Sequence, residues 1–252
     1  MNVTPLRAQA PVDHWQERVD LAAAFRLAAR MDWHEAVGNH FSLAVSEDGK
    51  RFLLNPRWRH FSTVRASELL LLDSDDTATM DRPDAPDPSA WCIHGHLHRY
   101  VRHARCVLHV HPPYGTALAA LEDPTLLPID QVTAKFYNRV AIDGDFGGIA
   151  DFAEEGERLA RALGRHRHML LGNHGVLCTG ATVAETFDEL YFLERAARTL
   201  VLAYSTGQPL KVLSHEVAER TARGWEDYGQ AAVCHFAEMK RILDAEDPSY
   251  AT

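Results

Sequence analysis

Residues 106–111 read Cys106-Val107-Leu108-His109-Val110-His111, an apolar run that carries two histidines one residue apart. Successive side chains of an extended strand point to opposite faces, so His109 and His111 fall on the same face. Pro112-Pro113 then ends the strand. The pair has the spacing that a single metal ion requires, at a strand end, where open α/β sheets build their sites.

A third histidine follows another short apolar run, Met169-Leu170-Leu171-Gly172, in the segment Asn173-His174-Gly175. We expect His174 to close a site with His109 and His111. Three protein ligands with an open position are typical of a catalytic metal centre, and neutral imidazole binds several divalent ions well. The prediction is one divalent metal ion, with zinc preferred and manganese, iron or cobalt as alternatives. The simpler interpretation, that these are ordinary strand histidines, stays open.

Composition excludes several classes of function. The chain has 252 residues and a net charge of −9, which argues against a nucleic-acid surface. No linker or repeat divides it, so we expect one domain over 1–252. Residues 1–11 lack a signal-peptide core and no apolar stretch is long enough to span a bilayer, which predicts a cytoplasmic protein without membrane contact. The four cysteines show no C-x-x-C spacing and are expected to be reduced.

Hydrophobic periodicity predicts short strands alternating with helices packed on both faces of a central sheet. The predicted strands are 41–45, 51–54, 69–72, 107–110, 140–142, 168–171 and 176–178. The predicted helices are 13–31, 89–103, 115–121, 152–163, 182–206 and 214–243. Asp13, Ser89 and Thr182 are the expected N-caps, and Glu185 would complete a capping box with Thr182.

Six segments occur in order along the chain: Gly38-Asn39-His40-Phe41-Ser42, Phe52-Leu53-Leu54-Asn55-Pro56, Ile93-His94-Gly95-His96-Leu97-His98, Val107-Leu108-His109-Val110-His111, Asn173-His174-Gly175-Val176-Leu177 and Asp247-Pro248-Ser249-Tyr250. This set resembles the class II aldolase/adducin family, in its adducin-like bacterial branch, over nearly the whole chain. The resemblance implies a three-layer α/β/α class II aldolase-like fold with a central mostly antiparallel or mixed sheet. It also implies a homotetramer with the active site between subunits.

The resemblance assigns His109, His111 and His174 as the ligands of the metal. In the sugar-phosphate aldolases of the family, that metal polarises a carbonyl of a small-molecule substrate and stabilises the negative charge formed as a carbon–carbon bond breaks. The family also places substrate contacts on the loop that enters the first hairpin, here at Asn39 and His40.

The chain departs from the phosphoaldolases at three positions. Ala90 stands where those enzymes have a glutamate, Gln131 where some have a proton-donating tyrosine, and Asn55-Pro56-Arg57-Trp58 replaces their phosphate loop. The histidines His94 and His98, four apart on one helical face, are candidates to replace the carboxylate in proton transfer. Alternatively, they pack beneath the metal site. The patch at Arg57-Trp58-Arg59-His60 would contact an anionic small molecule or a neighbouring subunit, or be a solvated loop.

Three classes of function remain. The preferred one is a metal-dependent lyase that cleaves a carbon–carbon bond of a small oxo- or hydroxy-carboxylate by aldol cleavage or decarboxylation. Decarboxylation tolerates Ala90, because carbon dioxide departs without a base. The second is a non-haem iron oxygenase on the same scaffold, since three histidines also suit iron. The third is a non-catalytic, adducin-like interaction protein.

Overall fold

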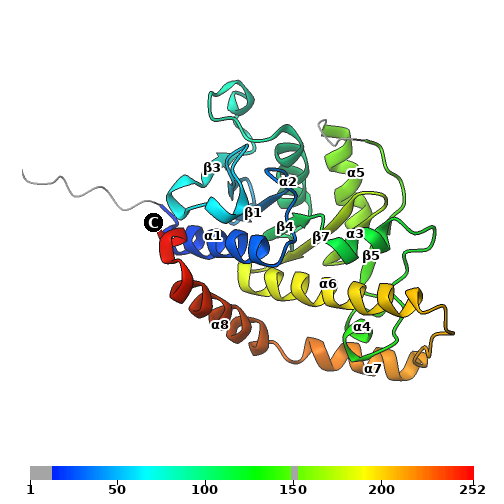
Figure 1. Ribbon diagram of the computed structural model, residues 1–252. Coiled ribbons are helices and arrows are strands. Elements are labelled where there is room, and N and C mark those ends of the chain that lie inside the picture. Colours follow the sequence, from blue (N-terminus) through cyan, green and yellow to red (C-terminus); the bar gives the residue numbers. More distant parts are fainter. Residues whose placement is uncertain (1–12, 149–152) are drawn as a thin grey trace, which may run out of the picture.

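A mixed seven-stranded sheet organises the molecule (Figure 1). The computed structural model describes residues 13–148 and 153–252. The strand order is β3-β2-β1-β4-β7-β6-β5, and every neighbouring pair is antiparallel except the parallel pair β5 and β6. The strands are β1 His40–Ala44, β2 Arg51–Leu54, β3 Leu70–Asp73, β4 Cys106–Val110, β5 Val140–Asp143, β6 His168–Leu171 and β7 Gly175–Gly180. The predicted mixed, mostly antiparallel sheet is confirmed.

Helices cover both faces of the sheet, as Figure 1 shows. The helices α1 and α6 pack on one face, α2 and α5 on the other, and α7 and α8 lie beyond α6. The helices are α1 Trp15–Arg30, α2 Pro88–Tyr100, α3 Pro113–Ala119, α4 Gln131–Lys135, α5 Ala153–Leu163, α6 Val183–Ser205, α7 His215–Glu226 and α8 Gln230–Glu246. Short 3-10 turns occupy Phe61–Thr63, Ala66–Glu68, Thr79–Asp81 and Pro248–Ala251. This is the predicted three-layer α/β/α fold.

The alternation of β4 decides which layer contains each of its side chains. Leu108 and Val110 join the core beneath α1 and α6, whereas Val107 joins the separate core beneath α2 and α5. His109 has the same parity as Val107 and therefore points to the α2 face. His40 pairs with His109 across β1 and β4, and Ser42 pairs with Val107, so these two polar side chains share that face.

Two predicted N-caps are wrong. His14, and not Asp13, occupies the N-cap of α1, with φ of 62°, while the backbone carbonyl of Asp13 accepts from Arg18 Nε. Asp87, and not Ser89, caps α2: its carboxylate accepts from the backbone N–H of Ser89 at 3.0 Å. Pro88 takes the first helical position because its fixed φ suits it, and the cap therefore lies two residues earlier than expected.

The cap of α6 is confirmed in part. The Thr182 hydroxyl accepts from the backbone N–H of Glu185 at 3.2 Å, as predicted. The Glu185 carboxylate, however, accepts from the backbone N–H of Ala181, so the reciprocal bond of a capping box is not made to Thr182 itself. Both contacts still satisfy donors at the entrance of the helix.

The C-terminal helix is divided. The sequence predicts one helix over 214–243, but Asp227, Tyr228 and Gly229 separate α7 from α8. Asp and Gly are poor helix formers, and the two helices pack on different partners, α7 on α4 and α8 on α6. The short α4 was not predicted, and Phe152, the expected start of the helix before 163, lies outside the described residues. Among the described residues, no helix is long and apolar enough to cross a membrane.

Candidate metal centre

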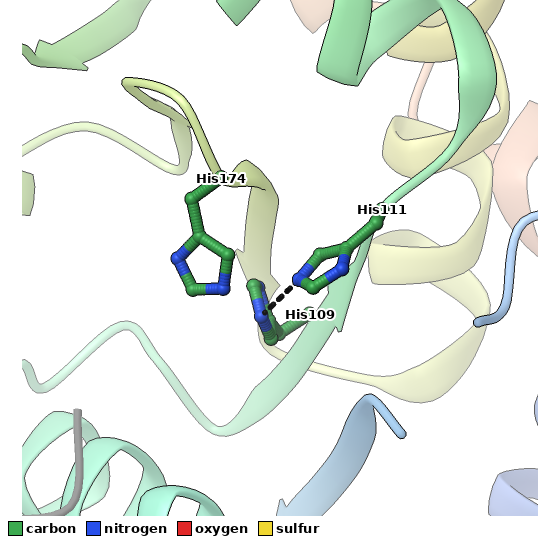
Figure 2. A group of neighbouring side chains, drawn as sticks. All are labelled: His109, His111 and His174. Atoms are coloured by element: carbon green, nitrogen blue, oxygen red, sulfur yellow. Dashed lines mark hydrogen bonds between the residues drawn. The ribbon is translucent and has the colours of Figure 1, made fainter. Parts of the chain in front are cut away.

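Three histidines converge where the central strands β4 and β7 adjoin, and Figure 2 shows their rings close together. His109 is in β4, His111 directly follows that strand, and His174 lies in the turn between β6 and β7. Their candidate ligand atoms lie within 4.8 Å of one another, and the ring centroids are 4.7 to 5.0 Å apart. The structure therefore brings together all three histidines predicted to hold a metal.

The Asn173-His174-Gly175 turn has residue types that its geometry requires. Asn173 has φ of 54°, a left-handed conformation that asparagine tolerates better than most residues. A Cβ atom at Gly175 would lie 2.6 Å from Cδ2 of His111 and 2.7 Å from the carbonyl oxygen of Val110. Only glycine allows this close approach, so it lets the imidazole of His111 lie against the turn that carries His174.

Hydrogen bonds fix which nitrogen two of the rings present. Nδ1 of His109 lies 3.0 Å from the carbonyl oxygen of Val176. A carbonyl oxygen can only accept a hydrogen bond, so Nδ1 carries the proton and donates it. In the same way, Nδ1 of His111 donates to the carboxylate of Glu35. Each ring is thereby left with an unprotonated Nε2, and these two atoms are 3.2 Å apart. Such a carboxylate or carbonyl partner behind a histidine is the arrangement that orients metal ligands.

The donor set fits a divalent metal. Two nitrogen lone pairs that face each other at 3.2 Å repel unless a cation or a proton lies between them. Tetrahedral zinc with Zn–N bonds of about 2.0–2.1 Å separates its nitrogen ligands by roughly 3.3 Å, which matches this spacing. The geometry and chemistry of His109, His111 and His174 therefore suit one ion held by three imidazoles.

Burial keeps the site in the protonation state that binds metal. Burial lowers the pKa of His109 well below its usual value, and the neighbouring His174 lowers it further. Burial, followed by the proximity of His111, lowers the pKa of His174 to about 4. Both rings are therefore neutral at pH 7, which is the state that coordinates a cation.

A cavity of about 500 Å³ adjoins the three histidines. Arg57 and Trp58 contribute to its lining, the guanidinium of Arg57 lying 4.5 Å from the Trp58 ring centroid and 3.5 Å from the carboxylate of Asp87. Phe146 adds a second aromatic side chain, 6.0 Å from the ring of His174. The cavity thus combines one cation, the two carboxylates of Glu35 and Asp87 and two aromatic rings with the polar side chains Asn39, Asn55, Ser89 and Asn173.

The two predicted substrate contacts line this cavity. Asn39 has φ of 68°, and its side-chain oxygen accepts from the backbone N–H of Glu35 at 2.9 Å. This bond ties the loop that carries Glu35 to the start of β1. His40 is 5% exposed and packs beside His109, with ring centroids 5.0 Å apart. That Asn39 and His40 bind substrate stays a prediction.

The two predicted proton-transfer residues lie behind His40. His94 and His98 share the face of α2 that covers β1, as their spacing predicts, and both are buried. His94 contacts the ring of His40, and neither residue is among those lining the cavity. Ala90, at the position of the family glutamate, packs in an apolar cluster with Phe52. The catalytic role of His94 and His98 stays a prediction.

Glu35 is the residue of the candidate site that sequence reasoning missed. It lies in the loop after α1, its side chain is 69% exposed, and its carboxylate meets His111 from 76 residues away in the sequence. No motif or periodicity marks such a residue. The one indirect signal is chemical: histidines that bind a metal through Nε2 need an acceptor at Nδ1, but the sequence does not say which residue supplies it.

Comparisons with known proteins agree with this geometry. The profile described as Class II Aldolase and Adducin N-terminal domain matches residues 19–201. A crystal structure of an aldolase II superfamily protein from Pseudomonas syringae is 33% identical, with a TM-score of 0.88 over 98% of this chain and 99% of that one. A Caulobacter vibrioides protein whose name places it among class 2 aldolases is 34% identical over 98% of this chain and 96% of its own length.

Two further relatives have names that describe reactions. Decarboxylase NovR of Streptomyces niveus is 28% identical over 92% of this chain and 85% of its own length. A Streptomyces roseochromogenus protein named 4-hydroxy-3-prenylphenylpyruvate oxygenase/4-hydroxy-3-prenylbenzoate synthase is 28% identical over 82% of this chain and 77% of its own length. Relatives of this chain therefore include both a decarboxylase and an oxygenase.

Proposed function

The chain belongs to the class II aldolase and adducin family, and from this premise we propose that it is a divalent-metal-dependent lyase. Its reaction would cleave a carbon–carbon bond of a small oxo- or hydroxy-carboxylate, by aldol cleavage or decarboxylation. The observation that carries the proposal is the convergence of His109, His111 and His174 beside a cavity large enough for such a substrate.

The proposed ligands are His109, His111 and His174, with zinc as the preferred ion. Bound there, a divalent cation would supply Lewis-acid stabilisation of the negative charge that develops on a substrate oxygen. Glu35 would hold His111 in the orientation in which Nε2 faces the ion. A metal held by three histidines with an open coordination position is typical of catalytic sites. This argues against a non-catalytic, adducin-like interaction protein.

Among the remaining cavity residues, Arg57 is the one that suits a carboxylate substrate. The two carboxylates of the cavity already have partners, since Glu35 is bonded to His111 and Asp87 lies 3.5 Å from Nε of Arg57. The guanidinium of Arg57 offers paired donors that match a carboxylate, and Trp58 and Phe146 would border the organic part of the substrate.

The absence of a carboxylate at Ala90 favours decarboxylation over aldol cleavage. In decarboxylation of a 3-oxo-carboxylate the bond to the carboxylate breaks, carbon dioxide leaves, and the electron pair of that bond moves through the adjacent carbon onto the carbonyl oxygen as an enolate. Solvent then protonates the carbon, and no base is needed to begin.

Oxygen dependence tests the reaction class. We expect the metal-loaded protein to release carbon dioxide or an aldehyde from one member of a panel of oxo- and hydroxy-carboxylates at the same rate in air and under argon. The His174→Ala variant should be inactive on that compound. The control is Thr179→Val, which removes a buried hydroxyl that donates to the Arg167 carbonyl. This variant should keep full activity. A strict requirement for oxygen would contradict the lyase.

The second candidate is a non-haem iron oxygenase. The printed name of the Streptomyces roseochromogenus relative favours it, and three imidazoles also accept iron. Iron in the purified protein together with oxygen consumption would favour the oxygenase over the lyase.

We also propose that the protein assembles as a homotetramer. Large apolar side chains are exposed at Trp58 and Phe146 beside the cavity and at Leu202 and Tyr204 near the end of α6. Subunit contacts that cover the rim of the cavity would exclude water from the reaction.

A further inference from the structure

A chain of buried polar side chains leads from the cavity into the layer between β1 and α2. Nδ1 of His40 lies 2.7 Å from Nε2 of His94, whose Nδ1 contacts the hydroxyl of Ser42. The same hydroxyl lies 2.6 Å from Nε2 of His98, and Nδ1 of His98 lies 2.7 Å from the carbonyl oxygen of Ala104. All four side chains are at most 5% exposed.

The Ala104 carbonyl sets the direction of every bond in this chain. A carbonyl oxygen only accepts, so the proton at that contact is on Nδ1 of His98, and its Nε2 must accept from the Ser42 hydroxyl. The Ser42 oxygen then accepts from Nδ1 of His94. Nε2 of His94 in turn accepts from Nδ1 of His40. Each contact contains one proton, and His40 is left with an unprotonated Nε2.

The opposite direction fails at the Ala104 end. It would place protons on Nε2 of His94 and of His98, and a neutral His98 would then turn a bare Nδ1 toward the Ala104 carbonyl at 2.7 Å. A doubly protonated His98 would avoid this clash of acceptors. Burial, however, lowers the pKa of His98 to about 4, and burial also lowers the pKa of His94 well below its usual value.

The free Nε2 of His40 faces the cavity. The hydroxyl oxygen of Ser89 lies 3.4 Å from this nitrogen. The Ser89 hydroxyl donates to the side-chain oxygen of Asp87 at 2.6 Å, so its proton is not directed at His40. Among the described residues, no donor is placed on Nε2 of His40, so this atom remains available to a ligand.

We propose that Ser42, His94 and His98 are positioning residues that hold His40 in the Nδ1–H tautomer, so that Nε2 accepts a hydrogen bond from a hydroxyl of the substrate. The chain ends on a peptide carbonyl, which cannot pass a proton onward, so it orients His40 and does not conduct protons to solvent. The role of His40 Nε2 in turnover rests on the proposed lyase function. The tautomer of His40 does not depend on that function.

This acceptor narrows the substrate class. A hydroxy-carboxylate whose hydroxyl reaches His40 would satisfy Nε2, and an analogue without that hydroxyl would leave a buried acceptor unpaired. Sites built to bind a hydroxyl discriminate strongly against compounds that lack it. His40 is therefore a specificity-determining residue for hydroxy-carboxylates over simple carboxylates.

Nitrogen NMR of the metal-loaded protein, labelled with ¹⁵N at histidine and assigned through the backbone, tests the tautomers directly. We expect protonated Nδ1 and unprotonated Nε2 at His40, His94 and His98. A protonated Nε2 on His40 would overturn the proposal, whether or not the protein proves to be a lyase.

The Ser42→Ala variant should interrupt the chain and leave His40 and His94 as mixtures of both tautomers. Thr179→Val removes another fully buried hydroxyl and should leave all three rings unchanged. If the folded Ser42→Ala protein still shows a single, unaltered tautomer of His40, the proposed positioning role of Ser42 is contradicted. If that variant does not fold, the spectrum of the unaltered protein still decides the tautomer.

Glycolate and acetate probe the acceptor, since they differ in one hydroxyl. We expect glycolate to shift the Nε2 signal of His40 and to bind roughly tenfold more tightly than acetate, and Ser42→Ala to reduce that ratio. Equal effects of the two anions on this signal, including no effect of either, would contradict the acceptor role.

Discussion

Glu35 and His111 show how single residues shape the candidate metal centre. The carboxylate fixes the proton on Nδ1 of His111 and so decides that Nε2 faces His109 and His174. The pair His109 and His111 was predictable because strand parity is local, and His174 was inferred from its place in the turn after a second apolar run. Glu35 was not, because only the path of the chain from α1 to β1 brings it to the end of β4.

Replacement of Glu35 should weaken metal binding without unfolding the protein. Loss of such a partner typically lowers metal affinity 10- to 100-fold, and we expect this range for Glu35→Ala in a competition titration with a chelator. Glu47→Ala, at another exposed loop glutamate, is the control and should bind metal normally. An affinity for Glu35→Ala equal to that of the control would show that His111 needs no partner.

Glu194 connects α6 to the segment that follows His111. Its carboxylate accepts from the backbone N–H groups of Tyr114 at 3.0 Å and Gly115 at 2.7 Å, in the first turn of α3. Burial raises the pKa of Glu194 from 4.5 to about 7, although both hydrogen bonds oppose this shift. Because the folded state holds this proton more tightly than the unfolded state, the stabilisation is full below pH 4.5 and is lost as pH rises to 7.

The Glu194→Gln variant should therefore lack this pH dependence. Relative to the unaltered protein, its free energy of unfolding should rise by about 2 to 3 kcal/mol between pH 4.5 and 7.5, since one pKa unit corresponds to about 1.4 kcal/mol. Urea denaturation at the two pH values measures the difference. A constant difference between the two proteins would mean that Glu194 is ionised throughout.

At the level of elements, local sequence predicts most strands and the long helices well. Alternation and helical spacing placed β1, β2, β4 and α6 because these signals depend on neighbours in the chain. The break between α7 and α8 could not be predicted, because it depends on which helix each segment packs against. The caps at His14 and Asp87 likewise depend on backbone angles that the side-chain pattern does not reveal.

Replacing two helical glycines by alanine should have opposite effects on the stability of the protein. A Cβ at Gly156 in α5 would lie 2.5 Å from the carbonyl oxygen of Cys92 and 2.6 Å from Nδ1 of His96, both in α2. We expect Gly156→Ala to force the two helices apart and to destabilise the protein by about 2 kcal/mol. Gly224 in α7 has nothing within 4 Å, so Gly224→Ala should stabilise it by up to about 1 kcal/mol.

Thermal or chemical unfolding of both variants checks this pair. Gly224→Ala controls for the general effect of replacing a helical glycine by alanine. An equal gain of stability in both variants would contradict the close packing of α2 on α5.

At the scale of the whole molecule, the sheet brings together residues that the sequence keeps apart. The order β1-β4-β7 places the segments that carry His40, His109 and His174 side by side. The buried chain behind His40 could not be predicted, since the i,i+4 spacing of His94 and His98 indicates a shared face but not what that face covers. The single-domain organisation over 1–252 and the tetramer stay predictions.

Metal analysis by plasma mass spectrometry tests the central claim most directly. Protein purified without added metal or chelator should contain about one zinc ion per chain. His109→Ala, His111→Ala and His174→Ala should each lose it while keeping their circular dichroism spectrum, and His215→Ala, an exposed histidine on α7, should retain it. Full metal content in all three site variants would contradict the assignment of the centre.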